Sequence, residues 1–428
     1  MHSVARVQHV DVDSIRGILT ERSPRGVLAR GLGRSYNDAA QNGGGRVVGL
    51  VGTEIGPPSA DGVLEVGGAT SFDALLHFII PKGWFVPVTP GTRFVSVGGA
   101  VASDVHGKNH HVVGSLGDHV IRIEMVLADG SIQIFDRASP VFFATLGGMG
   151  LTGIISRVWL QLIPIGSAFV AVRTKASSTL EETFAALDLH EEFPYSVAWL
   201  DTMASGRHLG RGVISHGRHA HPSEVAESDA LHYAPSHLLE VPPSLRWNVL
   251  TKGTVRAFNA LWHRRAVMRE GSSLESIPAF FHPLDAVGNW NRLYGVSGFV
   301  QHQMVVPDHN RAAIAAALGA LSAGGHPSFL GVLKRLGRAS GGPLSFPMPG
   351  WTLAVDLPNR GPATGRLLDR LDAIAVEAGG RVYLAKDSNV TRRRLAAMYP
   401  RLDEWNRVRD VVDPSRVFRS DLARRLDL

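Results

Sequence analysis

Three glycine-rich segments, at residues 31–45, 90–114 and 147–153, constrain the fold of this 428-residue chain more than any other feature of its sequence. Between them the sequence predicts short strands and tight turns, as in VLEVG at 63–67 and FVPVTPG at 85–91. Glycines let a backbone approach a ligand closely, and backbone N–H groups can satisfy an anion. The pattern therefore predicts a strand-rich domain that holds a flat or elongated anionic ligand against its backbone.

Two familiar phosphate-binding motifs are incomplete here. GLGRSY at 31–36 has Tyr36 where the dinucleotide fingerprint G-x-G-x-x-G needs its third glycine, and no acidic residue follows in the expected strand context. In the second segment, Ala102 replaces the first glycine of a P-loop and Asn109 follows the lysine. A Rossmann NAD site and a Walker motif are therefore not expected, and a plain glycine turn at 31–36 is the alternative to a pyrophosphate loop.

The stretch VHGKNHH at 105–111 carries three histidines and a lysine. His106 and His110 have the i, i+4 spacing of two zinc ligands, but the glutamate of H-E-x-x-H is absent. The chain has no cysteine, which excludes disulfides, thiolate metal ligands, iron–sulfur clusters and a cysteine nucleophile. We expect no metal site, and these imidazoles are also suited to packing and hydrogen bonding.

The composition is that of a globular protein of two or three domains, with 44% hydrophobic and 19% charged residues. The net charge of +6 comes without a dense basic face interleaved with aromatic residues, so nucleic-acid binding is not expected. The N-terminus lacks an apolar signal-peptide core, and no apolar run approaches the length of a membrane span. We expect a cytoplasmic or envelope-peripheral protein, whose membrane contact is peripheral.

Local signals predict individual elements along the chain. SFDALLHFIIPKG at 71–83 opens with Ser and closes on Gly, as capped helices do, and Asp129-Gly130 within 121–135 is a hairpin signal. Residues 216–290 are irregular, and long loops of this kind are usually functional or mobile. Elsewhere after residue 165, strands with helices on one side predict an α+β layer. The strands are expected at 169–174, 195–201, 298–307, 329–337 and 350–358 and the helices at 178–190, 309–323 and 364–378.

Four motifs together resemble the FAD-dependent oxidases of the vanillyl-alcohol oxidase superfamily: ARGLGRSYND, PGT…VGGAVASDVHGKNHH, GGMGLTGII and VDPSRVF. Within that superfamily the chain is similar, over nearly its whole length, to the decaprenylphosphoryl-β-D-ribose 2-oxidase family. The segments that carry this closer resemblance are FFHPLD, GFVQHQ, LSFPMPGW, YLAKDS and AMYPRLDEW. HGKNHH together with YLAKDS is specific, whereas the glycine loops alone would identify only the superfamily.

The resemblance implies an α+β fold of two domains. Residues 1–165, completed by 381–428, would bind FAD, and 166–380 would form an antiparallel-sheet substrate domain with a mobile loop region at about 216–290. Arg34 stands where some superfamily members carry the histidine that bonds to flavin, so non-covalent FAD is implied. The implied FAD contacts are Ala29, Arg30, Gly31, Leu32, Gly33, Arg34, Ser35, Tyr36, Asn37, Asp38, Ala39, Gly91, Ser96, Val97, Gly98, Gly99, Ser103, Asp104, Val105, His106, Ile155 and Tyr383.

The resemblance also implies the reaction. Hydride would pass from the 2-hydroxyl-bearing carbon of a prenylphosphoryl-β-D-ribose to the flavin, and the 2-keto sugar would be the first half of an epimerisation to the arabinose donor. An NAD(P)H-dependent reductase would complete it, and quinone or oxygen would reoxidise the flavin. Lys386 and His106 are the implied catalytic residues, although a lysine at a strand end can simply be a surface residue. The implied substrate contacts are Gly107, Lys108, Trp199, Gln301, Gln303, Lys334, Thr352 and Ala354.

Five positions depart from the residues common in the family, and all fall on the substrate side: Val197, Phe281, Leu336, Thr352 and Ala354. Flavin chemistry is therefore expected more firmly than the exact sugar. The alternatives are oxidation of another sugar, alditol or glycosyl phosphate, and a non-catalytic flavin- or lipid-binding protein, against which Lys386 argues. Apolar residues of the irregular stretch would meet a polyprenyl chain or membrane, or else pack partly in a surface loop: Leu238, Leu239, Trp247, Phe258 and Trp262.

Overall fold

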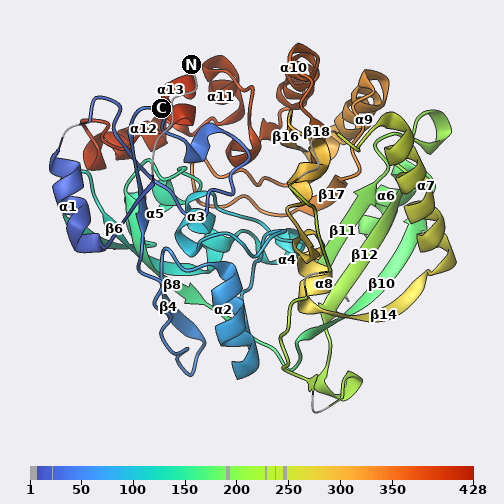
Figure 1. The fold of residues 1–428 in the computed structure, drawn as a ribbon, viewed down its shortest axis with the longest axis horizontal. Helices are drawn as coiled ribbons and strands as arrows, with labels where there is room; N and C mark the ends of the chain where they lie inside the picture. Colours follow the sequence, from blue (N-terminus) through green and yellow to red (C-terminus); the bar gives the residue numbers. More distant parts are fainter. Residues whose placement is uncertain (1–6, 22, 189–192, 227–228, 237, 244–247) are drawn as a thin grey trace.

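The computed structural model describes residues 7–21, 23–188, 193–226, 229–236, 238–243 and 248–428. It has two lobes side by side (Figure 1). The chain builds the first lobe, crosses to the second at β10, and returns so that its C-terminal helices lie on the first lobe again. Trp247 lies outside the described residues.

Two separate sheets form the first lobe. A parallel sheet has the order β1 (Val7–Val10), β3 (Arg46–Leu50), β2 (Val27–Ala29), and an antiparallel sheet has the order β4 (Val63–Gly67), β8 (Ile154–Gln161), β6 (Val120–Val126), β7 (Ile132–Asp136). The short strands β5 (Trp84–Phe85) and β9 (Ile163–Pro164) pair with each other. The helices of this part are α1 (Val12–Thr20), α2 (Phe72–Ile79), α3 (Val97–Ala102), α4 (His110–Val113) and α5 (Pro140–Thr145).

Local chemistry explains two elements predicted here. The side chain of Ser71 accepts a hydrogen bond from the Ala74 N–H and so caps α2, and Gly83 ends the following turn in the left-handed region at φ 78°. The predicted hairpin is also present: β6 and β7 are antiparallel, and Gly130 has φ 80° between them. Both predictions are confirmed.

One eight-stranded sheet dominates the second lobe, and all its neighbouring strands are antiparallel. Its order is β14 (Gly271–Ser276), β10 (Phe169–Ser177), β12 (Gly212–His219), β11 (Tyr195–Leu200), β17 (Gly331–Leu336), β18 (Gly350–Pro358), β16 (Phe299–Val306), β19 (Arg381–Val382). A separate ladder pairs β13 (Leu239–Glu240) with β15 (Val287–Gly288).

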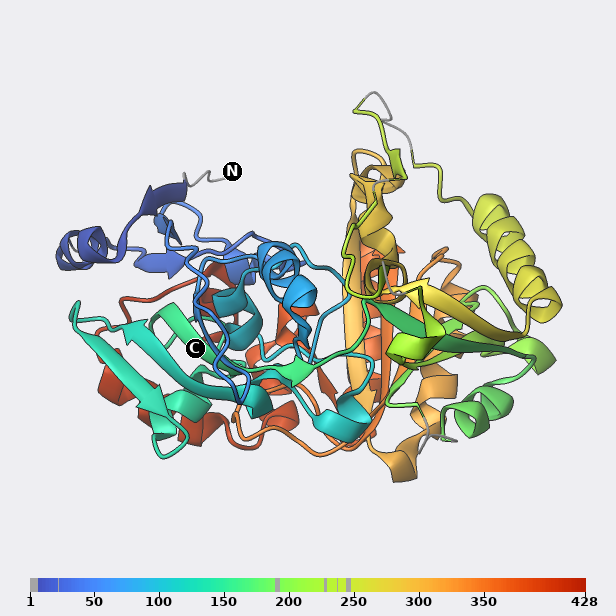
Figure 2. The same ribbon diagram turned by 90° about the horizontal axis from the view of Figure 1, so that it is seen from below.

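The two faces of this sheet have different environments because successive side chains of a strand point to opposite sides. Leu353, Val355 and Leu357 of β18 are buried in the same core as the helices α6 (Leu180–Leu187), α9 (Ala312–Gly324) and α10 (Pro362–Glu377). The intervening residues of β18 point to the opposite face. In Figure 2 the sheet stands between the first lobe and the helices of the second. That second face is the one available to a ligand held between the lobes.

The C-terminal segment ties the lobes together. After β19 it passes through the short turn η10 (Leu384–Lys386) and forms α11 (Arg392–Met398), α12 (Leu402–Val412) and α13 (Asp421–Leu426). Trp405 Nε1 donates to the Ala144 carbonyl at 2.9 Å, and the Arg425 guanidinium contacts Asp38 of the first glycine loop. The last helices are therefore packed on the first lobe (Figure 1).

The stretch 216–290 is more ordered than its sequence predicts. It contains the end of β12, a 17-residue helix α7 (Lys252–Met268), the edge strand β14 and the short helix α8 (Ile277–Phe281). Helical periodicity of apolar residues fails for α7 because its buried positions are Val255, Asn259 and Ala266, one of them polar. No helix within the described residues is long and apolar enough to cross a bilayer.

Candidate active site

Strand register gathers most of the predicted substrate residues on the sheet face that looks toward the first lobe. Gln303 lies opposite Ala354 and Gln301 opposite Asp356, while Lys334 of β17 lies opposite Thr352. Directly opposed residues of antiparallel strands project to the same side. The sheet therefore offers a polar floor of amide, hydroxyl, carboxylate and ammonium groups.

His106, from the second glycine segment, meets this floor. Its Nε2 lies 2.9 Å from Gln303 Nε2, and Gln303 donates at 2.9 Å to Thr352 Oγ1. Burial and the nearby Lys334 charge hold the pKa of His106 well below its usual value, so the imidazole is neutral and accepts from the Gln303 amide. Its Nδ1 has no hydrogen-bond partner within the described residues. The contact joins the two lobes at the centre of the site.

Two partly buried lysines, Lys334 and Lys386, lie near enough to His106 to lower its pKa, and a third, Lys108, acts in turn on Lys334. Lys386 lies on η10, Lys334 on β17, and Lys108 two residues after His106. Burial lowers the pKa of Lys334 to about 7, with help from the charges of Lys386 and Lys108, and burial lowers the pKa of Lys108 to about 8. The pKa of Lys386 is likewise lowered by burial and partly restored by Asp356. Such a cluster suits an anion and gives its amines proton-transfer capacity near neutral pH.

Asp356 is a functional candidate that our sequence analysis missed. It is fully buried, accepts a hydrogen bond from Gln301 Nε2 and has an Oδ2 atom without a partner among the described residues. Burial raises its pKa, and the Lys386 charge opposes that rise. The sequence did carry a signal for it, the alternation of side chains along a strand. In GWTLAVDLP, Asp356 is two residues after Ala354 and four after Thr352, so all three lie on one face.

The first glycine loop has the chemistry of an anion cradle. Arg30 N–H donates to the Val48 carbonyl and Tyr36 N–H to the Ala385 carbonyl, but within the described residues the N–H groups of 31–35 have no hydrogen-bond acceptor. A Cβ on Gly31 would lie 2.0 Å from Ser96 Oγ, so glycine is required where this loop meets the second glycine segment. The free amides and the absence of a Cβ fit a pyrophosphate laid along the loop.

The remaining predicted FAD residues lie around this junction. Ser96 caps α3, which contains Val97, Gly98 and Gly99, and a Cβ on Gly98 would lie 3.4 Å from that of Ile155. Tyr383 Oη donates to the Ser103 carbonyl at 2.8 Å, and its ring stacks on Phe346. The other predicted FAD residues differ in exposure. Leu32 and Arg34 are exposed, Gly33, Ser35 and Val105 are partly exposed, and Asn37 and Ala39 are buried. Ala29 belongs to β2, and Gly91 has no atom within 4 Å of the place where a Cβ would lie.

Some predicted residues make contacts within the protein. Asp104, at φ 41°, accepts from the Gly117 N–H at 2.9 Å and from the Ser345 hydroxyl, so its carboxylate fastens the turn after α3. Asp38 pairs with Arg425, and Trp199 Nε1 donates to the Phe329 carbonyl at 2.8 Å. The polar side-chain atoms of Asp104, Asp38 and Trp199 are thus engaged within the protein, so any ligand contact of these residues would use their other atoms.

Lys108 points away from the Gln303 floor. Its Nζ donates to the Phe280 carbonyl and lies 4.0 Å from the centroid of the Phe280 ring. Phe281, one of the departures from the family pattern, is buried beside it, and its ring lies 4.8 Å from that of Tyr195. The predicted phosphate contact of Lys108 therefore stays a prediction, and Lys334 is nearer to the other polar groups of the floor.

Leu336 is buried, Val197 is partly exposed, and the Gly107 carbonyl is 3.5 Å from Lys334 Nζ.

The other residues of VHGKNHH contribute structure. His110 Nε2 lies 3.2 Å from Ser115 Oγ, and its Nδ1 accepts from the Gly337 N–H at 3.0 Å, which fastens α4 to the end of β17. Among the described residues, no group of three or more His, Cys, Asp or Glu side chains is placed to hold a metal ion.

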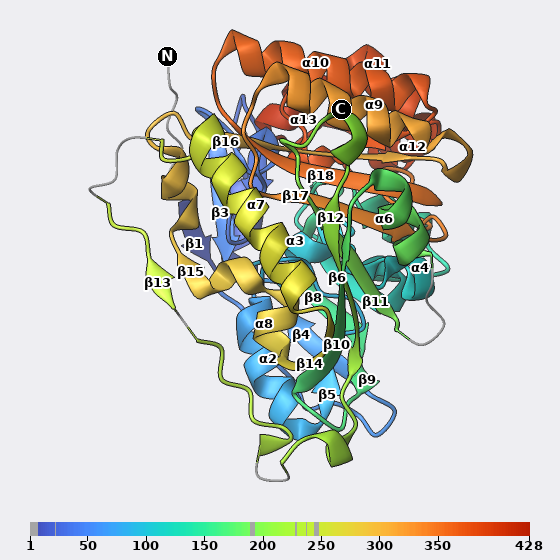
Figure 3. The ribbon, with the colours of Figure 1, turned by 90° about the vertical axis from the view of Figure 1, so that its right-hand side faces the viewer.

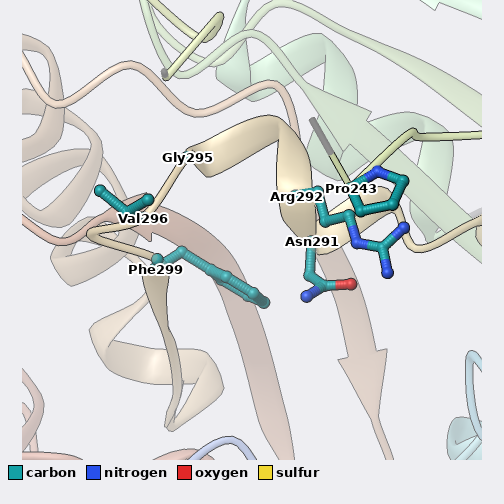
Figure 4. Close-up of a pocket in the computed structure, with 7 residues that line it drawn as sticks. Pro243, Asn291, Arg292, Gly295, Val296 and Phe299 are labelled. Atoms are coloured by element: carbon teal, nitrogen blue, oxygen red, sulfur yellow. The ribbon is translucent and has the colours of Figure 1, made fainter. Parts of the chain in front are cut away.

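A cavity of about 500 Å³ is lined by Pro243, by residues of the turn η8 (Trp290–Tyr294) and by the segment that leads from it into β16. Asn291, Arg292 and the ring of Phe299 project toward the same space (Figure 4). The Phe299 ring also packs edge-on against Tyr36, with centroids 5.6 Å apart. Phe299 therefore connects the cavity to the loop that we assign to the cofactor, and the cavity is lined by both a cation and apolar side chains.

Comparison with family models locates two known regions in the chain. Residues 10–136 match the model of an FAD binding domain, and residues 358–426 match that of D-arabinono-1,4-lactone oxidase. The first match contains both glycine segments whose free amides and close approaches were described above. The cofactor of this fold is FAD, and the polar and glycine-rich lining fits it.

A curated relative decides the family. The chain is 41% identical over 419 residues to decaprenylphosphoryl-β-D-ribose oxidase of Mycolicibacterium smegmatis, covering 95% of this chain and 90% of the relative. This chain belongs to the decaprenylphosphoryl-β-D-ribose oxidase family. It is thus an FAD-dependent oxidoreductase of the vanillyl-alcohol oxidase type, as its motifs predicted, with the α+β fold and large antiparallel sheet expected for it.

Two further relatives have lower identity to this chain. An uncharacterized protein in the mprA 5′ region of Streptomyces coelicolor is 37% identical over 83% of this chain and 99% of the relative. An alditol oxidase from a Streptomyces species is 28% identical over 33% of this chain and 35% of the relative.

Proposed function

We propose that this protein oxidises the hydroxyl-bearing C2 of a prenylphosphoryl-β-D-ribose to the 2-keto sugar. Membership of the family supports this substrate, and the lysine-rich floor between the lobes supports an anionic sugar ligand. The single observation that carries the proposal is the convergence of Lys386, Lys334 and His106 beside the FAD-binding loops.

The chain's own groups divide the work of binding and proton transfer. Bound FAD supplies the acceptor for the hydride that leaves the carbinol carbon. Lys386 Nζ, in its neutral form, accepts the hydroxyl proton as the C2–O bond becomes a carbonyl, and the resulting ammonium hydrogen-bonds the carbonyl oxygen. Gln301 and Gln303 present amides that orient the ring hydroxyls, and His106 fixes the amide of Gln303.

Charge in the site favours the phosphate. Lys334 lies opposite Thr352 on the floor, and its pKa is lowered by burial and by the charges of Lys386 and Lys108. An anion in this position would relieve that repulsion. We propose that Lys334 contacts the phosphate, and that a separate NAD(P)H-dependent reductase then reduces the keto sugar. Quinone or oxygen would reoxidise the cofactor.

A second substrate class has a specific observation in its favour. The residues that line the floor include Ala354 and Thr352, two departures from the usual family pattern, and the chain is similar to an alditol oxidase over a third of its length. Oxidation of another sugar, an alditol or a glycosyl phosphate is therefore the alternative.

An anaerobic flavin-bleaching screen tests these proposals. Purified holoprotein is mixed with prenylphosphoryl ribose, free ribose, other glycosyl phosphates and alditols, and the flavin absorbance is followed. We expect bleaching with prenylphosphoryl ribose, and none in Lys386→Ala, which should retain its FAD. Bleaching by alditols alone would show that an alditol, and not prenylphosphoryl ribose, is the substrate. Full bleaching in Lys386→Ala would show that Lys386 is not the base. Lys82→Ala, an exposed lysine of the first lobe, is the matched control.

A further inference from the structure

Exposed apolar side chains are concentrated on one part of the second lobe. Among the described residues, nine of the sixteen large hydrophobic side chains that are most exposed lie between residues 238 and 296. Five of them belong to the single helix α7, which crosses the outer side of the second lobe (Figure 3). We call these five side chains the α7 face: Phe258, Leu261, Trp262, Val267 and Met268.

The helix α7 does not follow the pattern of an ordinary surface helix: it buries Val255, Asn259 and Ala266 and leaves five large apolar side chains exposed. Its inward side is held by polar contacts: Asn259 Nδ2 donates to Asp201 Oδ1 at 2.7 Å, and His263 Nε2 lies 2.9 Å from the Ser177 carbonyl. Its outward side carries the α7 face, with Leu261 and Met268 each 67% exposed. Surface helices normally bury their apolar stripe and expose their polar one. Because hydrogen bonds fix this orientation, the apolar side is presented to the surroundings by the fold itself.

The charged residues of α7 itself have one sign, and the first acidic residue after it is Glu270. From Lys252 to Arg269 the sequence has five basic residues and no Asp or Glu. Within the described part of the chain, none of the ion pairs involves these five: Lys252, Arg256, Arg264, Arg265 and Arg269. Arg264 and Arg265 are exposed between Trp262 and Val267. An apolar face with tryptophan and unpaired arginines complements a lipid surface with anionic headgroups.

We propose that the α7 face docks this protein onto an anionic lipid surface. The aromatic, leucine and methionine side chains enter the headgroup–acyl boundary, and Arg256, Arg264 and Arg265 contact lipid phosphates. The stacked rings of Phe258 and Trp262, with centroids 6.2 Å apart, form a rigid apolar wedge. This docking is independent of the proposed reaction, because it follows from the outer face of α7 and not from the floor between the lobes.

The docking surface is joined to the substrate side of the second lobe. The Phe258 ring packs edge-on against Phe329, with centroids 6.3 Å apart, and the Phe329 carbonyl accepts the Trp199 indole N–H. The Val249 N–H, just before α7, donates to the Leu293 carbonyl beside the cavity of Figure 4. A protein docked through α7 would therefore hold this side of its substrate lobe close to the lipid.

Vesicle flotation tests the proposal. The holoprotein is mixed with vesicles of phosphatidylcholine alone or with added phosphatidylglycerol, at low and high salt. We expect binding to the anionic vesicles that weakens as salt rises. The double variant Leu261→Asp/Met268→Asp, and separately Arg264→Glu/Arg265→Glu, should each lower the partition coefficient roughly tenfold or more.

Matched controls separate this surface from general effects of charge and polarity. Ile134→Asp and Val411→Asp replace exposed apolar residues of the first lobe, and Arg366→Glu/Arg370→Glu reverses two exposed arginines of α10. These controls should bind vesicles as the unmodified protein does, and all variants should retain FAD. Failure to bind anionic vesicles, or unchanged binding in the α7 variants, overturns the proposal. So does a dimer in light scattering that Leu261→Asp/Met268→Asp dissociates, because the face would then be covered by a second copy.

Discussion

Asp356 and Lys386 form the pair of residues on which the chemistry depends most. The carboxylate is buried, has an unpartnered oxygen and favours the charged form of Lys386. A base must be neutral before it can accept a proton. Because the Asp356 charge raises the pKa of Lys386, it keeps the amine protonated, and so unable to act as a base, up to a higher pH. Its contribution should therefore be visible in the pH profile, not only in the rate.

Asp356→Asn removes the charge but keeps an oxygen for Gln301 Nε2. Loss of the carboxylate lowers the pKa of Lys386 further, so the acidic limb of the kcat/KM profile should move to lower pH by about one unit. Asp372→Asn is the matched control, because Asp372 is equally buried but contacts His302 on the helix-covered side. An unshifted acidic limb in Asp356→Asn would show that the two groups are not coupled.

Lys334 predicts a second, opposite pH effect. Because its pKa is lowered to about 7, Lys334 is charged below that pH and neutral above it. Binding of a phosphate-bearing substrate should therefore weaken as pH rises through about 7, lowering kcat/KM. Lys334→Arg keeps the charge and should move this decline to higher pH, whereas Lys334→Met should lose roughly tenfold in kcat/KM at pH 6. Identical alkaline limbs in the unmodified protein and Lys334→Arg would exclude Lys334 as the titrating group.

At the scale of elements, sequence reasoning succeeded where one local signal determines the structure. Ser71 caps the start of α2, Gly83 ends the turn that follows it, and Gly130 lies in the turn between β6 and β7. It failed for α7, because that helix buries Asn259 and exposes Trp262 and so lacks the usual apolar period. It also could not show that Asp104 and Trp199 bond to distant main chain, since such contacts depend on tertiary packing. The division into domains and the FAD contacts stay predictions.

The contact of Gly31 in the first glycine loop with Ser96 in the second predicts that FAD binding depends on how closely the two loops approach. Gly31→Ala would place a methyl group 2.0 Å from Ser96 Oγ, so the first loop must shift away from the N-terminus of α3. We expect FAD affinity to fall roughly tenfold or more, measured by flavin release on dilution. Gly17→Ala in α1, with nothing within 4 Å, is the control that should not change affinity. Adding Ser96→Ala to Gly31→Ala removes the clashing oxygen and should recover part of the loss; no recovery would locate the defect elsewhere.

At the scale of the whole molecule, the site is assembled from three distant parts of the chain. The first lobe contributes the glycine loops and His106, and the eight-stranded sheet contributes the polar floor. The C-terminal segment contributes Lys386 and then returns to the first lobe, where Arg425 joins them. Sequence motifs identified the parts, but only the fold shows that α13 connects the first glycine loop to the segment that carries Lys386.

Substitution of Arg425 tests whether the C-terminal helix α13 holds these parts of the chain together. Its guanidinium makes a paired contact with Asp38 at 2.8 and 2.9 Å and a third with the buried Asp387, next to Lys386. Arg425→Leu should lower the free energy of unfolding by about 2 kcal/mol, because it leaves a buried carboxylate without its cation. It should also weaken FAD, since the loop end at Asp38 is released. Arg311→Leu, which removes an exposed contact with Glu181, should change the free energy of unfolding by less than about 0.5 kcal/mol. Chemical denaturation with and without added FAD measures both effects, and equal losses in the two variants would show that the C-terminal helix is not a fastening point.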